Sequence, residues 1–98
     1  MRLKDKVAVI TGANSGIGRA IAERFAAEGA HVGVNYRAGK DPAQRRAEVG
    51  EMLKSLKTDG LGLEGDASKR PDIERIVGEL VTRFGRLDVA VVNAGIEI

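Results

Sequence analysis

The chain has 98 residues, of which 43% are hydrophobic and 31% are charged, with thirteen glycines, one histidine and no cysteine. A chain of this length buries one modest core, so a second independent domain is excluded, as are disulfides, thiolate metal sites and a cysteine nucleophile. Sixteen basic and fourteen acidic residues alternate along the chain and only three residues are aromatic, so we expect neither metal chemistry nor a nucleic-acid partner.

The N-terminal segment does not resemble a targeting or membrane-spanning sequence. Residues 1–6 carry several charges, but the apolar run at residues 7–10 is far too short for a signal core or a membrane span. We therefore expect a cytoplasmic protein with no membrane partner.

The first predicted elements are a strand at residues 7–10 and a helix that begins after the glycine cluster. The strand is a continuous apolar run closed by Thr11-Gly12, which is typical of a parallel strand covered on both faces. Gly29 stands where a left-handed cap would end the helix. Its inward side is predicted from apolar residues at helical spacing: Ile17, Ala20, Ile21 and Phe25.

A second strand is expected at residues 31–35, and a second helix opens at Asp41-Pro42, with Asp as N-cap and Pro in the first turn. Thr58-Asp59-Gly60 is expected to end this helix. Its inward side is predicted from Val49, Met52, Leu53 and Leu56.

A weak third strand at residues 61–64 leads into a third helix, which Ser68 is expected to cap and Gly85 to end. A fourth strand is expected at residues 87–92. The apolar side of the third helix is the clearest periodic pattern in the chain: Ile73, Ile76, Val77, Leu80, Val81 and Phe84.

Strands that alternate with helices predict an α/β fold with a Rossmann-type parallel sheet of strand order 3-2-1-4, half of a doubly wound domain. In this order the first two helices cover one face and the third helix covers the other. We expect residues 1–98 to form an N-terminal cofactor-binding half-domain truncated after the fourth strand. A bare sheet edge and uncovered Val and Ile side chains beside the third helix then predict self-association.

The glycine loop between the first strand and the first helix is the strongest functional pattern. Gly12 permits a tight turn, Gly16 lets the main chain approach a pyrophosphate, and Gly18 lets the helix pack against the strand. Free amides at the helix N-terminus would face the anion. The alternative is a glycine-rich connection without a ligand. A Walker P-loop is excluded because Ile17 follows Gly16 where that motif requires lysine.

Thr11-Gly12-x-x-x-Gly16-Ile17-Gly18 together with Asn93-Ala94-Gly95 resembles the short-chain dehydrogenase/reductase family over the whole chain. The segment around Tyr36 is similar to bacterial glucose 1-dehydrogenases and 3-oxoacyl carrier-protein reductases. The family transfers hydride between a nicotinamide cofactor and an alcohol or carbonyl. The resemblance implies that Ser15 to Ile17 line the pyrophosphate, that Asp66 and Ala67 meet the adenine, and that Asn93 to Gly95 run beside the nicotinamide-side ribose.

Structural alternatives remain open for several of these residues: Asp66 as a turn cap, Asn93 as a strand-end hydrogen bonder, and Tyr36 as turn packing in place of a wall for adenine. The predicted cofactor-binding residues are Gly12, Asn14, Ser15, Gly16, Ile17, Gly18, Tyr36, Arg37, Asp66, Ala67, Asn93, Ala94 and Gly95.

The end of the second strand favours NADP over NAD. NAD-binding members place a carboxylate there for the ribose hydroxyls, whereas a nearby Arg accommodates the 2′-phosphate of NADP. Here the segment reads Asn35-Tyr36-Arg37, so a carboxylate is absent and Arg37 offers a guanidinium suited to a phosphate. A solvent-exposed loop arginine is the alternative.

The catalytic Ser, Tyr and Lys of the family come after the Asn-Ala-Gly strand and are absent from these 98 residues, so we expect no turnover by this chain alone. Tyr36 and Lys40 match the Tyr-x-x-x-Lys spacing by coincidence, because Gly39 and the Asp41-Pro42 boundary argue against a helix there. Two other hypotheses are a non-enzymatic dinucleotide-binding module and an interaction half-domain completed by another subunit.

Overall fold

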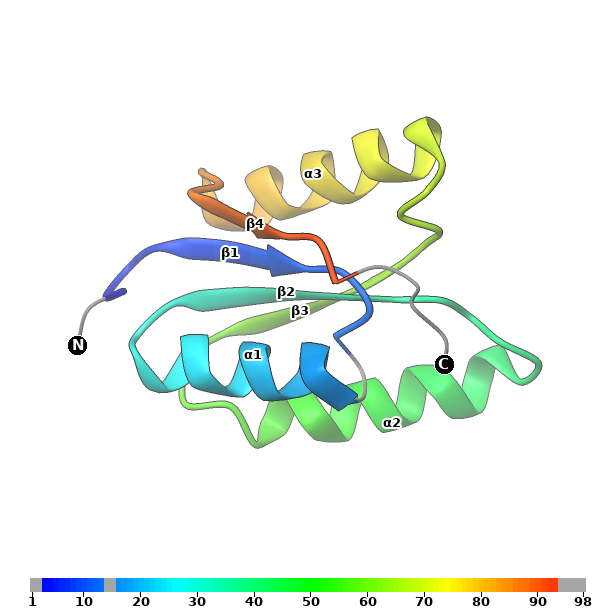
Figure 1. Cartoon of the computed structure of the whole chain (residues 1–98), viewed down its shortest axis with the longest axis horizontal. Helices are drawn as coiled ribbons and strands as arrows, with labels where there is room; N and C mark the ends of the chain where they lie inside the picture. The colour runs from blue at the N-terminus through cyan, green and yellow to red at the C-terminus, as the bar shows by residue number, and fades with distance from the viewer. Residues whose placement is uncertain (1–2, 14–15, 94–98) are drawn as a thin grey trace.

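The computed structural model describes residues 3–13 and 16–93, in which strands and helices alternate. The strands form one parallel sheet of order β3-β2-β1-β4, as predicted (Figure 1). This is the Rossmann-type arrangement. The elements are β1 (Val7–Ile10), α1 (Gly16–Ala27), β2 (His31–Tyr36), α2 (Pro42–Lys54), β3 (Gly60–Glu64), α3 (Arg70–Phe84) and β4 (Val89–Val91).

Helices cover both faces of the sheet, with α1 and α2 on one side and α3 on the other (Figure 1). Alternate residues of β1 point to opposite faces: Ala8 and Ile10 belong to the apolar cluster under α1 and α2, whereas Val7 and Val9 belong to the cluster under α3. The continuous apolar run of β1 is explained by this two-sided burial.

The prediction that Val side chains beside α3 are uncovered is wrong for strand β1. Val7 is 1% exposed and Val9 is 6% exposed, because Ile76 and Leu80 of α3 pack over them. In β4, Ala90 is exposed while Val89 and Val91 are partly buried. A single helix therefore covers the central strand, and the edge strand is covered less well.

Several predicted boundaries differ from the structure. Strands β2 and β3 are each one residue longer than predicted, since β2 extends to Tyr36 and β3 begins at Gly60. Helix α2 ends at Lys54, before the expected Thr58-Asp59-Gly60, because the N–H of Ser55 turns back to the carbonyl of Met52 at 3.0 Å. Strand β4 is shorter than residues 87–92. Ser68 does not cap α3: the cap position is Lys69, which makes no side-chain cap bond.

The inward side predicted for α1 is wrong in part, because Ile17 is 73% exposed and Ala20 is also exposed. The helix packs closely against the start of the glycine loop, so its buried residues are small: Gly18, Ala22 and Ala26.

The apolar sides of α2 and α3 are placed as predicted. Val49 and Met52 of α2 and Ile76 and Leu80 of α3 are buried. Within α3, Val81 is the exception at 40% exposed, because it lies at the border of the apolar side of the helix. The left-handed cap predicted at Gly29 is confirmed by its φ of 99°, and Gly85 ends α3 as predicted, with a φ of 81°.

None of the helices within residues 3–13 and 16–93 is both long enough and apolar enough to cross a bilayer.

Candidate functional site

The glycine loop leaves the carboxyl end of β1, in the centre of the sheet. The N–H of Thr11 donates to the carbonyl of Val91 in β4 at 3.0 Å, and the N–H of Ala13 donates to the carbonyl of Asn35 in β2 at 3.0 Å. The start of the loop is thus fixed to both neighbouring strands. Ligands of open α/β sheets bind beyond the carboxyl ends of the strands, and this loop occupies that position.

Gly18 is the point at which α1 approaches the loop most closely. A Cβ atom at Gly18 would lie 2.3 Å from the carbonyl oxygen of Gly12 and 2.5 Å from Nδ2 of Asn93. These separations are below any normal contact, so a larger residue would push the helix away from β1. The role predicted for Gly18 in close helix packing is confirmed by this geometry.

Gly16 faces open space at the start of α1. Its φ is +60°, in the left-handed region, and a Cβ there would meet nothing within 4 Å. The first turn of α1 has no acidic residue, so its free amides present a positive end to the space beside Gly16. These features fit a diphosphate. Ile17, next in the helix, is 73% exposed, and the predicted residues Asn14 and Ser15 lie outside the described residues.

Asn93 connects the end of β4 to the glycine loop. Its N–H donates to Oγ1 of Thr11 at 2.8 Å, and its side-chain amide donates to the carbonyl of Gly12 at 3.5 Å. The structural alternative for Asn93 is therefore present in the structure. Contact with a ribose remains a prediction, and Ala94 and Gly95 lie outside the described residues.

Asn35 is a structural residue that the sequence reasoning missed. It is 2% exposed, and its side-chain amide donates to the carbonyls of Leu63 at 2.9 Å and Gly65 at 3.2 Å. The amide thereby ties β2 to the end of β3 and to the turn that follows. A polar residue at the end of an otherwise apolar strand was the available signal, because a buried polar side chain needs partners.

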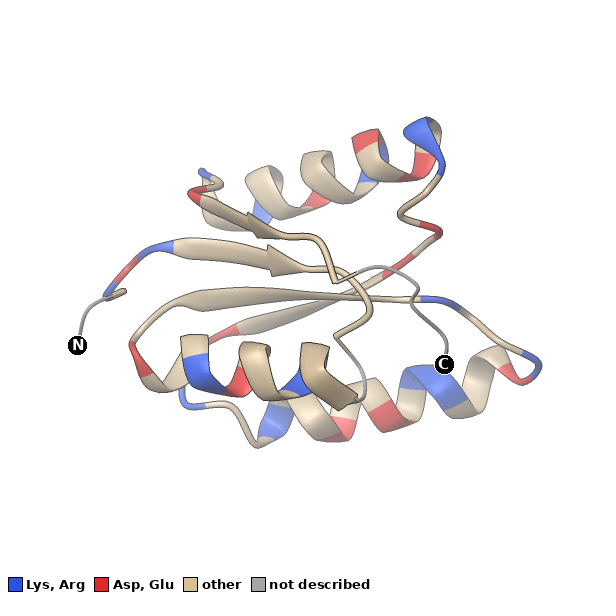
Figure 2. Ribbon diagram, in the orientation of Figure 1, with Lys and Arg blue, Asp and Glu red and all other residues tan. Residues whose placement is uncertain are grey.

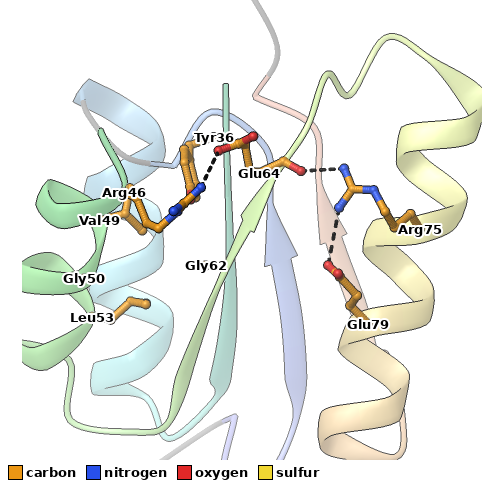
Figure 3. Close-up of a pocket in the computed structure, with 9 residues that line it drawn as sticks. All are labelled: Tyr36, Arg46, Val49, Gly50, Leu53, Gly62, Glu64, Arg75 and Glu79. Atoms are coloured by element: carbon orange, nitrogen blue, oxygen red, sulfur yellow. Dashed lines mark hydrogen bonds and ion pairs between the residues drawn. The ribbon is translucent and has the colours of Figure 1, made fainter. Parts of the chain in front are cut away.

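The side chain of Tyr36 packs on the face of the sheet that α1 and α2 cover. It is 4% exposed and belongs to the apolar cluster under α1 and α2. It lines a pocket of about 410 Å³ between α2 and α3 at the outer edge of β3. In this pocket Glu64 lies between Arg46 and Arg75 (Figure 3). This burial supports the packing alternative for Tyr36. Of the predicted site residues that the structure describes, only Tyr36 lines the pocket.

Arg37 and Asp66 meet beyond the ends of β2 and β3. Nη2 of Arg37 lies 3.3 Å from Oδ2 of Asp66, and Figure 2 shows further basic charge in the same β2–α2 loop. Oδ1 of Asp66 accepts hydrogen bonds from the N–H of Ser68 at 2.9 Å and from its hydroxyl at 2.6 Å. These bonds and, to a lesser degree, Arg37 hold the pKa of Asp66 below its ordinary value.

The turn-capping alternative for Asp66 is thus present in the structure, and it explains why Ser68 is not available to cap α3. Contact between Asp66 and adenine remains a prediction. Ala67, the other residue predicted to meet adenine, is partly buried in the same turn.

Two further sequence predictions concern catalysis and metals. Tyr36 is the last residue of β2 and Lys40 lies in the following loop, so the rejection of this pair as a helical Tyr-x-x-x-Lys motif is confirmed. No cluster of three His, Asp or Glu side chains suited to a metal occurs in the part of the chain that the structure describes.

Comparison with known proteins agrees with the observed fold. Residues 6–98 match the family model for short chain dehydrogenases. The chain is 41% identical over 95 residues to a short-chain dehydrogenase/reductase of Pestalotiopsis microspora, covering 97% of this chain and 35% of that protein. It is 39% identical over 92 residues to a 3-oxoacyl-(acyl-carrier-protein) reductase of Staphylococcus epidermidis, covering 94% of this chain and 36% of the relative.

Solved structures give the same result. A short-chain dehydrogenase/reductase from Serratia marcescens superposes with a TM-score of 0.80 at 34% identity, covering 98% of this chain and 38% of that one. A short chain dehydrogenase from Mycobacterium paratuberculosis, bound to NAD, superposes with a TM-score of 0.84 at 32% identity, covering 99% and 39%. The chain spans about a third of the length of the curated relatives it matches. On the family match and these identities, the chain belongs to the short-chain dehydrogenase/reductase family.

Proposed function

We propose that this chain is the NADP-binding portion of an oxidoreductase that transfers hydride between NADP(H) and an alcohol or carbonyl substrate. The observation that carries the proposal is the β1–α1 loop, where Gly18 lets the helix approach and Gly16 leaves open space at the helix N-terminus. The dinucleotide, when bound, supplies or accepts the hydride. The residues of this chain bind and orient it.

The preference for NADP is supported by charge at the end of β2. Arg37 is the first residue after the strand and its side chain is 75% exposed, so its guanidinium is accessible to a phosphate. A carboxylate that would bind ribose hydroxyls is absent from residues 35–37. The similar structure from Mycobacterium paratuberculosis contains NAD and gives no support for NADP. The proposed preference for NADP therefore rests on the residues of this chain.

Titration with NADPH and NADH, followed by the fluorescence of the reduced nicotinamide, tests the proposal. We expect tighter binding of NADPH, and we expect Arg37→Ala to weaken NADPH about tenfold to a hundredfold while NADH changes little, because a charge-assisted bond to phosphate is lost. Arg46→Ala is the matched control, because Arg46 is similarly exposed at 71% and also pairs with a carboxylate, that of Glu64. Equal affinity for both cofactors would contradict the NADP preference, and no saturable binding would contradict the proposed function.

We also propose that the chain is cytoplasmic and self-associates through the β4 side of the sheet. Among the described residues β4 pairs only with β1, its Ala90 is exposed, and Val92 is 78% exposed. Size-exclusion chromatography with light scattering should give a mass above 10.4 kDa. A cooperatively melting monomer would contradict self-association.

A further inference from the structure

The contact between Arg37 and Asp66 is set by the main chain of two neighbouring strands. Tyr36 of β2 is paired with Glu64 of β3, and the N–H of Gly65 donates to the carbonyl of Tyr36 at 2.9 Å. The residues that follow these strands, Arg37 and Asp66, therefore leave the same edge of the sheet side by side. Their 3.3 Å contact follows from the strand pairing.

The two partners differ in how firmly they are held. The side chain of Asp66 is 21% exposed, and its Oδ1 accepts both hydrogen bonds from Ser68. Its N–H also donates to Oδ2 of Asp72 at 2.7 Å. Arg37 has a long side chain that is 75% exposed and that loses much rotamer entropy when fixed. Asp66 is thus the fixed partner and Arg37 the mobile one.

The main chain of Arg37 is held by a residue of helix α2. Nη1 of Arg45, in α2, donates to the carbonyl of Arg37 at 3.0 Å. Asp41 caps α2 by accepting from the N–H of Gln44 at 3.1 Å, which fixes the position of the helix end that carries Arg45. With its carbonyl held by Arg45, the remaining freedom of Arg37 is in its side chain, which Asp66 contacts.

We propose that Asp66 is a positioning residue for cofactor selection, whose carboxylate holds the guanidinium of Arg37 beside the carboxyl ends of β2 and β3 to receive the 2′-phosphate of NADP. This inference rests on the proposed NADP-binding function. Asp66 contacts Arg37 through one oxygen and one nitrogen, and a guanidinium has five N–H donors, so donors remain for a phosphate. Preorganisation of this kind raises affinity because less entropy is lost on binding.

The negative charge of Asp66 also repels a phosphate, and this effect opposes positioning. The pair is exposed on the Arg37 side, where water and salt weaken the repulsion, so we expect positioning to be the larger effect. Two substitutions separate the contributions. Asp66→Asn removes the charge but keeps an oxygen that accepts from Arg37 and Ser68, whereas Asp66→Ala removes both.

The test measures the preference, defined as the dissociation constant of NADH divided by that of NADPH, for the wild type and each variant. We expect Asp66→Ala to lower the preference up to about fivefold, the range that an exposed ion pair supports, and Asp66→Asn to lower it less. Loss of an adenine contact would weaken both cofactors equally and leave the preference unchanged. In an Arg37→Ala background, Asp66→Ala should no longer lower the preference and should raise it slightly, because only the repulsion between Asp66 and the phosphate is then removed.

Ser68→Ala is the control for damage to the turn. It removes one of the two hydrogen bonds to Oδ1 of Asp66 but keeps the bond from the N–H of Ser68 and the carboxylate beside Arg37, so the preference should fall clearly less than in Asp66→Ala. Circular dichroism establishes that each variant folds, and Asp66→Asn supplies the result if Asp66→Ala does not fold. Calorimetry with 2′,5′-ADP and 5′-AMP repeats the comparison on the adenosine half alone.

Each outcome has a distinct meaning. If the wild type shows no preference for NADPH, the proposed function fails and this inference fails with it. If the wild type prefers NADPH and Arg37→Ala removes the preference, an unchanged or raised preference in both Asp66→Asn and Asp66→Ala overturns this inference alone. Loss of the preference in Ser68→Ala to the same extent as in Asp66→Ala would assign the effect to the turn, which also overturns it.

Discussion

Replacement of Gly18 by alanine tests whether the close approach of α1 to the glycine loop is required. Alanine is otherwise the more favourable residue inside a helix, by about 1 kcal/mol over glycine. At Gly18 the added methyl group would lie 2.3 Å from the carbonyl oxygen of Gly12, and the same group would meet Nδ2 of Asn93 at 2.5 Å. The backbone of Gly12 lies in a turn that is hydrogen-bonded to two strands, so it cannot move aside as a flexible side chain can.

The expected cost follows from two opposing contributions. Overpacking in a filled region costs about 1–3 kcal/mol, and contact with a fixed backbone carbonyl belongs at the upper end of that range. After the gain in helix propensity is subtracted, we expect Gly18→Ala to lower the free energy of unfolding by about 2 kcal/mol. In a domain of this size, that change lowers the melting temperature by roughly 8–16 °C.

Gly78→Ala is the matched control, because Gly78 lies inside α3 and a Cβ there would meet nothing within 4 Å. We expect this variant to be more stable than the wild type by about 0.5–1 kcal/mol. Thermal and urea denaturation, followed by circular dichroism at 222 nm, compare the two variants. If Gly18→Ala is as stable as Gly78→Ala, the reasoning that assigns Gly18 to close packing is refuted.

Three further predictions concern the loop and the sheet ends. Gly16→Val should raise the dissociation constant of NADPH about tenfold or more, because it fills the open space at the helix N-terminus, and unchanged affinity in titration would contradict the loop assignment. Arg86 and the N–H of Val7 lower the pKa of Asp88, so the stability that Asp88 provides is present at neutral pH and is lost as the pH falls below about 4. Asp88→Asn should therefore reduce the dependence of unfolding on acid pH, and a dependence equal to that of the wild type would argue against this. Asn35→Ala should destabilise the fold by about 2–3 kcal/mol in urea, since two carbonyls lose their donor, and a loss below 0.5 kcal/mol would show that water replaces the amide.

The strands and helices followed from local patterns in the sequence, because each pattern reports burial, and the strand order followed from the general rules for strands that alternate with helices. The apolar run of β1 is buried on both faces, and the periodic apolar side of α3 meets the sheet at Ile76 and Leu80. Asp41-Pro42 begins α2 through a hydrogen bond within four residues. Such features depend on residues close in sequence, so they can be predicted without any tertiary information.

Two of the errors and omissions arose where a side chain has more than one possible partner. Ser68 stands one residue before the cap position of α3, but its hydroxyl donates to Asp66 instead. The sequence pattern indicates only that Asn35 ends a strand, whereas its side-chain amide binds two carbonyls about thirty residues later in the chain. Propensity indicates that these residues favour turns and ends of strands, but it does not specify the partner, which is set by how β2 and β3 pair.

Asn35, at the end of β2, connects the glycine loop to the predicted adenosine end of the site. The carbonyl of Asn35 accepts from Ala13 in the glycine loop, while its side-chain amide holds the turn that leads to Asp66. Asn35 is buried and contacts both segments, so a change there should move the loop and the Arg37–Asp66 pair together. A variant of Asn35 that stays folded should therefore lose affinity for NADH as well as NADPH, because both contain the diphosphate, whereas a variant of Asp66 should change mainly the ratio between them. This difference separates a residue that supports the whole site from one that positions a single side chain.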